Sequence, residues 1–152
     1  MKSLVFLGII LLASCQLQQS PIPANPAAPQ APSRAPRNLD AKLTSIDLLT
    51  LFPLQQKGAV LLYDARPAFV ARFGKIPGAI SWPRHQLDAQ LPLREAEILT
   101  ATRSGKTIVF YCTDADCPDA HFMAERMVAH GHSVSILDGG IASWKDAGLP
   151  TK

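Results

Sequence analysis

The sequence lacks the features of several large classes of protein. No uninterrupted apolar run reaches the roughly 20 residues that a membrane-spanning helix needs. Of 15 basic residues, Lys2, Arg34 and Arg37 precede residue 39, which leaves 12 basic against 12 acidic residues in 39–152 and no cluster of Lys or Arg. Binding to nucleic acid through its phosphates needs a basic cluster, so we expect no nucleic-acid partner. No heptad pattern or internal repeat is present.

The first residues predict export from the cytoplasm. Lys2 precedes ten apolar or small residues (4–13), a pattern typical of a signal peptide over residues 1–14. The letters LASC, ending at Cys15, resemble the lipobox of bacterial lipoproteins. That resemblance implies cleavage before Cys15 and acyl chains, palmitate among them, on this cysteine, and several chains would hold the protein stably on a membrane. Gln16 follows, where inner-membrane lipoproteins often have Asp, so the outer membrane is favoured. An ordinary secretory signal is the alternative.

Residues 15–38 have the composition of a tether. Six of the thirteen prolines fall here, with almost no large apolar side chain, so we expect an extended linker without a core. Residues 39–152 have the length of one ordinary domain. We therefore expect one folded domain, held as a monomer on the periplasmic side of an envelope membrane.

Within this domain, short apolar runs alternate with helical patterns. Continuous runs, which suit strands buried in a parallel sheet, occupy 59–63, 108–111 and 134–137. Helix-forming patterns occupy 44–52, after a capping Thr or Ser, 93–105 and 118–131. The alternation predicts an α/β domain with a mostly parallel sheet.

A cysteine ends the central apolar run. Cys112 follows Tyr111 directly, and the loop after it leads to a helix that begins near Pro118. Backbone N–H groups of such a loop and the helix dipole would stabilise a thiolate there. A buried, unreactive cysteine is the alternative, but the position at the end of a strand favours a functional thiol.

Three motifs resemble the rhodanese family. The segment LLYDARPAFVARFGKIPGAISWP (61–83) is similar to its first signature, IVFYC (108–112) to the strand that leads to its catalytic cysteine, and ILDGGIASWKDAGLP (136–150) to its closing signature. The resemblance implies a five-stranded sheet with helices on both faces, no cofactor, and a persulfide carried on Cys112. It also implies that Asp64 and Arg66 form a structural pair near the site.

The loop after Cys112 departs from the family pattern. It contains Thr113, Asp114, Ala115, Asp116 and Cys117, where the family usually has Arg, Lys and Gly. Carboxylates raise the pKa of a nearby thiol and repel a dianion, so we expect weak turnover of thiosulfate. Phosphatases of this fold need an Arg for phosphate, and the sequence has none between Cys112 and Arg126, so we reject that activity.

The second cysteine of the loop has two interpretations. Cys117 could form a disulfide with Cys112 and act as a resolving thiol, or it could simply begin the helix. A zinc site of Cys112, Cys117 and His121 lacks a fourth ligand, so we expect no metal.

The sequence thus predicts a lipid-anchored sulfurtransferase that meets a small sulfur donor, a thiol acceptor and possible periplasmic protein partners. Two alternatives stay open. One is an inactive domain of the same fold that serves as a binding module, and the other is a thiol–disulfide redox protein that uses Cys112 and Cys117.

Overall fold

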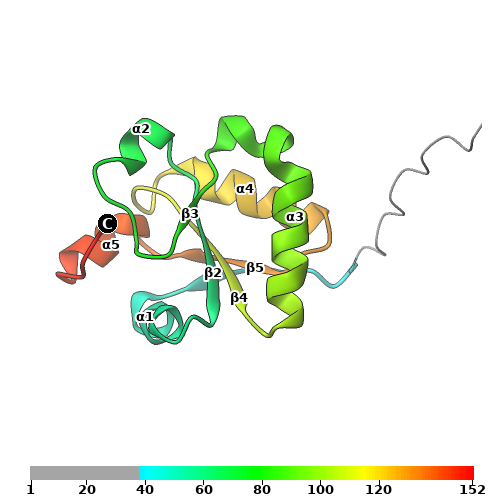
Figure 1. Ribbon diagram of the computed structural model, residues 1–152, viewed down its shortest axis with the longest axis horizontal. Coiled ribbons are helices and arrows are strands. Elements are labelled where there is room, and N and C mark those ends of the chain that lie inside the picture. Colours follow the sequence, from blue (N-terminus) through cyan, green and yellow to red (C-terminus); the bar gives the residue numbers. More distant parts are fainter. Residues whose placement is uncertain (1–37) are drawn as a thin grey trace, which may run out of the picture. The chain divides into compact units, whose positions relative to one another are not determined.

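The computed structural model describes residues 38–152, which form one sheet with helices on both of its faces (Figure 1). The five strands lie in the order β1-β5-β4-β2-β3, and every pairing is parallel. This confirms the predicted α/β fold and its five-stranded sheet. The strands are β1 (Leu43–Ile46), β2 (Val60–Asp64), β3 (Ile80–Ser81), β4 (Thr107–Tyr111) and β5 (Val134–Leu137).

The predicted signal peptide, Cys15 and all but the last residue of the tether lie outside the described residues. Among residues 38–152, no helix has the length and apolarity needed to cross a bilayer.

Helices cover the two faces of the sheet in pairs. Leu51 of α1 (Leu48–Gln56) and Trp144 of α5 (Gly140–Asp146) are buried in one apolar cluster. Ile98 of α3 (Leu87–Arg103) and Met123 of α4 (Pro118–Ala129) belong to a second cluster on the opposite face. The short helices α2 (Ala68–Ala71) and η1 (Arg84–Gln86) lie in the connections that follow β2 and β3. Trp82 and Trp144 are fully buried, one in each cluster.

The central strand β4 sends its side chains alternately into the two clusters. Ile108, Phe110 and Cys112 belong to the cluster under α3 and α4, while Val109 and Tyr111 belong to the cluster under α1 and α5. The period of two in a strand requires this alternation. Cys112 and Tyr111 therefore face opposite sides of the sheet at the end of the same strand.

Two predicted helices were wrong at their starts. Residues 44–46 are part of β1, and α1 begins after Asp47, whose Oδ1 accepts a 2.7 Å hydrogen bond from the Thr50 N–H. Asp47, and neither Thr44 nor Ser45, is thus the capping residue. The helix expected over 93–105 begins at Leu87 and includes Pro92.

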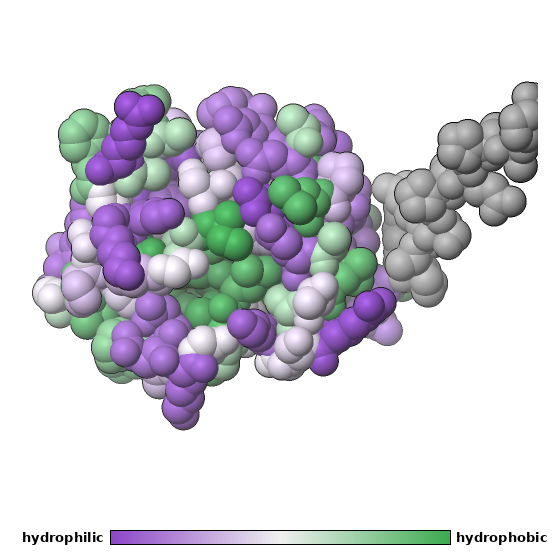
Figure 2. All heavy atoms as spheres, in the orientation of Figure 1, coloured by the Kyte–Doolittle hydropathy of each residue, from purple (hydrophilic) through white to green (hydrophobic). Residues whose placement is uncertain are grey.

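One edge of the sheet is only partly covered. β3 has two residues and pairs with Tyr63 and Asp64, so the first half of β2 has no neighbour on that side within the part of the chain that the structure describes. On the face of the molecule that Figure 2 shows, apolar side chains gather in the middle. Leu61 of β2 and Leu93 of α3 line a cavity of about 490 Å³ there.

Candidate functional site

Cys112 lies at the carboxyl end of the central strand. It follows β4, which pairs with β2 on one side and β5 on the other, and its residue surface is only 2% exposed. The loop 113–116 is exposed and leads directly to Cys117 and α4. Ligands of open parallel sheets bind beyond this end of the strands. The buried thiol is therefore placed at the edge where such sheets act on their ligands.

The loop after Cys112 is held by the start of α5. The Ile141 N–H donates to the Cys112 carbonyl at 2.9 Å, and the Ala142 N–H donates to the Thr113 carbonyl at 3.0 Å. Gly140 has a φ of +57°, and a Cβ there would lie 2.6 Å from the Cys112 carbonyl oxygen. The two loops approach so closely that only glycine fits at position 140.

Replacing Gly140 with alanine is expected to destabilise the protein by about 2–5 kcal/mol, since the left-handed conformation costs an L-residue about 1–2 kcal/mol and overpacking about 1–3 kcal/mol. Urea unfolding measures the loss. Gly105→Ala is the matched control, because Gly105 also has a positive φ (+72°) but nothing within 4 Å of its Cβ position. Equal losses in the two variants would show that the contact with the Cys112 carbonyl has no cost.

Cys112 and Cys117 form a disulfide. Their Cα atoms are 6.0 Å apart, an ordinary separation for a disulfide. Cys117 occupies the N-cap position of α4, with Pro118 at the first helical position, but its side chain makes no capping hydrogen bond. Of the two interpretations that the sequence left open, the paired one matches this structure. A small cavity of about 70 Å³, lined in part by Ser45 and His121, lies beside the two sulfurs.

The carboxylates of the loop are not equivalent. Asp114 and Asp116 are exposed, and the Asp116 N–H donates to Asp114 Oδ1 at 3.1 Å. That N–H is therefore already occupied within the loop. Asp119, in the first turn of α4, instead forms an ion pair of 3.3 Å with Arg84. Asp114 and Asp116 thus form no ion pair with another residue that the structure describes, whereas Asp119 does.

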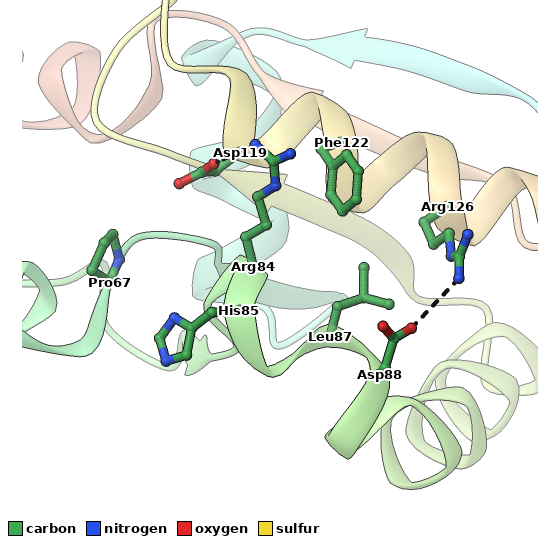
Figure 3. Close-up of a pocket in the computed structure, with 8 residues that line it drawn as sticks. All are labelled: Pro67, Arg84, His85, Leu87, Asp88, Asp119, Phe122 and Arg126. Atoms are coloured by element: carbon green, nitrogen blue, oxygen red, sulfur yellow. Dashed lines mark hydrogen bonds and ion pairs between the residues drawn. The ribbon is translucent and has the colours of Figure 1, made fainter.

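Arg84 is the site residue that the sequence did not reveal. It belongs to η1, 35 residues before Asp119, and its guanidinium also lies over the ring of Phe122 at 4.0 Å (Figure 3). The only local signal is its position directly after Pro83, where the first signature ends. An arginine of η1 therefore lies near the thiol, although the loop after Cys112 contains none.

Behind the thiol, Asp64 and Arg66 form a buried ion pair. Arg66 donates to both Asp64 oxygens, at 2.9 and 2.7 Å, and to the Gly74 carbonyl at 2.9 Å. The Tyr111 hydroxyl donates to Asp64 Oδ2 at 2.9 Å and accepts a 3.2 Å bond from the Ile76 N–H. This network fixes the connection 65–76 and the residue that precedes Cys112.

Burial shapes the acid–base behaviour of this network. Burial raises the pKa of Tyr111 well above its ordinary range, and the charge of Asp64 raises it further. Burial acts to lower the pKa of Arg66, but the hydrogen bond and charge of Asp64 outweigh it, and the net shift is upward. Tyr111 stays a neutral donor and Arg66 stays charged, so both act as fixed supports.

The sulfurs of Cys112 and Cys117 and a carboxylate oxygen of Asp119 all lie within 4.8 Å of one another. In the disulfide form neither sulfur is the thiolate that zinc requires. His121, weighed as a ligand from the sequence, is exposed and is not part of this group.

A comparison with protein families gives one match over most of the domain. The model described as "Rhodanese-like domain" matches residues 52–147. The chain belongs to the rhodanese-like family. Its sequence resembles an HTH-type transcriptional regulator of Mycobacterium tuberculosis, with 36% identity over 99 residues, 63% of this chain and 39% of the regulator. The chain spans between 39% and 52% of the length of the curated relatives that it matches.

Solved structures agree with the family. A rhodanese-related protein from Thermoplasma volcanium superposes with a TM-score of 0.59 at 23% identity, over 72% of this chain and 97% of that one, and shows the fold alone. A thiosulfate sulfurtransferase from Pseudomonas aeruginosa has 26% identity and a TM-score of 0.56, over 74% of this chain and 20% of that one. The rhodanese-like family thus includes sulfurtransferases, and Cys112 of this rhodanese-like chain follows the central strand.

Proposed function

We propose that the protein is a sulfurtransferase that carries sulfane sulfur as a persulfide on Cys112. The observation that supports it most directly is the position of this residue. Cys112 directly follows the central strand of a rhodanese-like sheet, and the loop that it begins accepts hydrogen bonds from the N–H groups of α5. The disulfide is the oxidised form of the site. A thiol reductant opens it by exchange and is itself oxidised to a disulfide, which leaves Cys112 and Cys117 as thiols.

The transfer then needs no further oxidant. The Cys112 thiolate attacks the outer sulfur of the donor, a new S–S bond forms, and the donor's own S–S bond breaks. The donor fragment leaves with the bonding electron pair, as sulfite from thiosulfate or as a thiolate from an organic persulfide. An acceptor thiolate next attacks the outer sulfur of the Cys112 persulfide and releases the Cys112 thiolate.

The charges around the loop favour some donors over others. Asp114 and Asp116 repel a dianion such as thiosulfate, while the charge of Asp119 is countered by Arg84. We therefore expect organic persulfides to load Cys112 faster than thiosulfate does.

The test is a mass measurement on the reduced protein after brief exposure to an organic persulfide, to inorganic polysulfide and, separately, to thiosulfate. A gain of one sulfur, mapped to the peptide that contains Cys112, supports the function. A reduced protein that gains no sulfur from any of the three donors would rule it out.

The disulfide favours a second candidate, a thiol–disulfide redox function. In one version Cys117 resolves the persulfide. Its thiolate attacks Cys112 Sγ, the bond to the outer sulfur breaks, and that sulfur leaves as hydrosulfide, which regenerates the disulfide. A purely redox protein would interconvert its dithiol and disulfide at a measurable potential without sulfur transfer.

Replacing Cys117 with alanine is expected to preserve sulfur loading on Cys112 but to speed its oxidation to sulfinic acid severalfold under peroxide. The reason is that Cys117 captures the sulfenic acid of Cys112 as a disulfide before a second oxidation occurs. Mass spectrometry of timed peroxide reactions measures the sulfinic form in the variant and in the wild type. Equal rates would leave Cys117 without a protective role.

We also propose that acyl chains on Cys15 hold the domain at the periplasmic side of an envelope membrane, the outer one being favoured, as a monomer that meets small thiols and protein partners. This part rests on the sequence of residues 1–38 alone.

A further inference from the structure

The connection between β2 and β3 carries large apolar side chains on its surface. Phe69 of α2 is 66% exposed, and Phe73, which follows the helix, is 83% exposed. The chain still turns at Phe73, whose N–H donates to the Val70 carbonyl at 3.1 Å. Side chains four residues apart lie on the same side of a helical turn. Single exposed apolar residues are ordinary, but two neighbouring phenyl rings mark an interaction surface.

The connection that presents these rings is fixed by hydrogen bonds. The buried Arg66 guanidinium donates to the Gly74 carbonyl at 2.9 Å. The backbones of Lys75 and Lys152 exchange two hydrogen bonds, of 2.8 and 2.9 Å. The rings are therefore held outward on a fixed support, so that little further ordering is needed when they meet a partner.

The charge around the two rings is positive. No acidic residue occurs from 65 to 87, whereas Arg72 and Lys75 lie on either side of Phe73 in the sequence. Arg72 is exposed and Lys75 is partly exposed, and neither forms an ion pair with another residue that the structure describes. At the left of Figure 2, hydrophilic and apolar side chains lie side by side over α2. The surface thus combines aromatic rings with unpaired cations.

This combination suits a membrane that contains anionic lipids. Apolar side chains enter the boundary between head groups and acyl chains, and cations are attracted to the phosphates, so the two contributions add. The linker expected over residues 15–38 would reach roughly 70 Å at ~3.1 Å per residue. A domain on such a tether meets its membrane at a high effective concentration, so a weak contact suffices.

α2 lies at the edge of the sheet that carries Cys112. It follows the carboxyl end of β2, and β2 runs parallel to β4, so both strands end at the same edge. Pro67, the N-cap residue of α2, lines the same hollow as Asp119, whose carboxylate lies within 4.8 Å of the sulfur of Cys112 (Figure 3). A membrane that contacts α2 would therefore lie close to this thiol.

We infer that α2 and the residues after it form a membrane-docking surface, which binds anionic phospholipids and turns the edge of the sheet with Cys112 toward the bilayer. The docking surface consists of Phe69, Arg72, Phe73 and Lys75. Its binding to lipid depends neither on the acyl anchor nor on sulfur transfer, whereas the orientation of the thiol on its own membrane rests on the proposed function.

The test measures how residues 16–152 sediment with lipid vesicles. This chain lacks Cys15 and therefore carries no acyl group, but it folds alone because both apolar clusters lie within residues 38–152. We expect binding to vesicles of phosphatidylcholine with phosphatidylglycerol. Binding to pure phosphatidylcholine should be about tenfold weaker or more, and salt should release the chain from the anionic vesicles.

Substitutions assign the binding to the docking surface. Phe69→Ser combined with Phe73→Ser should weaken vesicle binding about tenfold or more, and Arg72→Gln should weaken it about fivefold. Leu49→Ser and Arg103→Gln are the matched controls and should leave binding unchanged. Leu49 is an 87% exposed apolar residue of α1, and Arg103 is an exposed arginine at the end of α3.

No binding to the anionic vesicles, or equal losses in the controls, would overturn the inference and leave the exposed rings to a protein partner. A protein without acyl chains on Cys15 would refute the proposed anchor, and a Cys112 that takes up no sulfur would refute the proposed transfer. Neither of these results changes the vesicle binding of residues 16–152, so each failure is recognised separately.

Discussion

Replacing Cys112 with serine is expected to abolish sulfur loading completely. The serine hydroxyl has nearly the same size, so the buried position at the end of β4 keeps its packing, but an alcohol cannot take a sulfur atom from a persulfide at neutral pH. Mass spectrometry after exposure of the reduced variant to an organic persulfide measures the result, which should be no gain of sulfur on the loop peptide.

Cys117→Ser is the paired control for this experiment. Because Cys117 is the partner in the disulfide and not the residue that ends the strand, its variant should load sulfur on Cys112. Loss of loading in both variants would mean that the two thiols act as a unit, as in a redox protein. Loading in Cys112→Ser with the sulfur on Cys117 would move the carrier role to the helix N-terminus.

The buried strands could be predicted from the sequence because burial on both faces leaves a continuous apolar run. β2, β4 and β5 all have this pattern, and their predicted positions agree with the structure to within one residue. β1 was missed because its first three residues are exposed at the sheet edge, so Thr44 and Ser45 resembled a helix cap. β3 has two residues, too few for any pattern.

The start of α3 shows how a local rule can mislead. Pro92 favours a helix boundary, since proline in a helix interior removes a hydrogen bond. In the structure the helix begins at Leu87, six residues before the predicted start at 93, and continues through Pro92. Packing of Leu87 and Ile98 into the core accompanies this longer helix.

The site depends on contacts between segments that are distant in the sequence. Such contacts could not be predicted from the sequence alone. Cys112 was recognisable because it ends an apolar run. Its contact with the α5 start through Gly140, and the arrival of Arg84 beside Asp119, depend on how loops meet at the edge of the sheet. Of the three carboxylates near the thiol, Asp119 of α4 has an arginine partner, whereas no ion pair joins Asp114 or Asp116 to another described residue.

The largest effect on stability is expected from the Asp64–Arg66 pair. Asp64 is fully buried, and Arg66 donates to both of its oxygens. Removing one member of a buried pair leaves the other charge without compensation, which costs about 3–5 kcal/mol. Arg66→Met removes the cation, so we expect a loss of this size in the free energy of unfolding, measured with urea.

The double variant Asp64→Asn with Arg66→Met separates the unpaired charge from lost packing. Asparagine keeps an acceptor for the Tyr111 hydroxyl but carries no charge, so the double variant should be more stable than Arg66→Met alone. Arg103→Met, on an exposed arginine, should change stability by less than about 0.5 kcal/mol. If Arg66→Met cost no more than this control, the pair would not stabilise the fold. Tyr111 would then hold the end of β4, and with it Cys112, through packing alone.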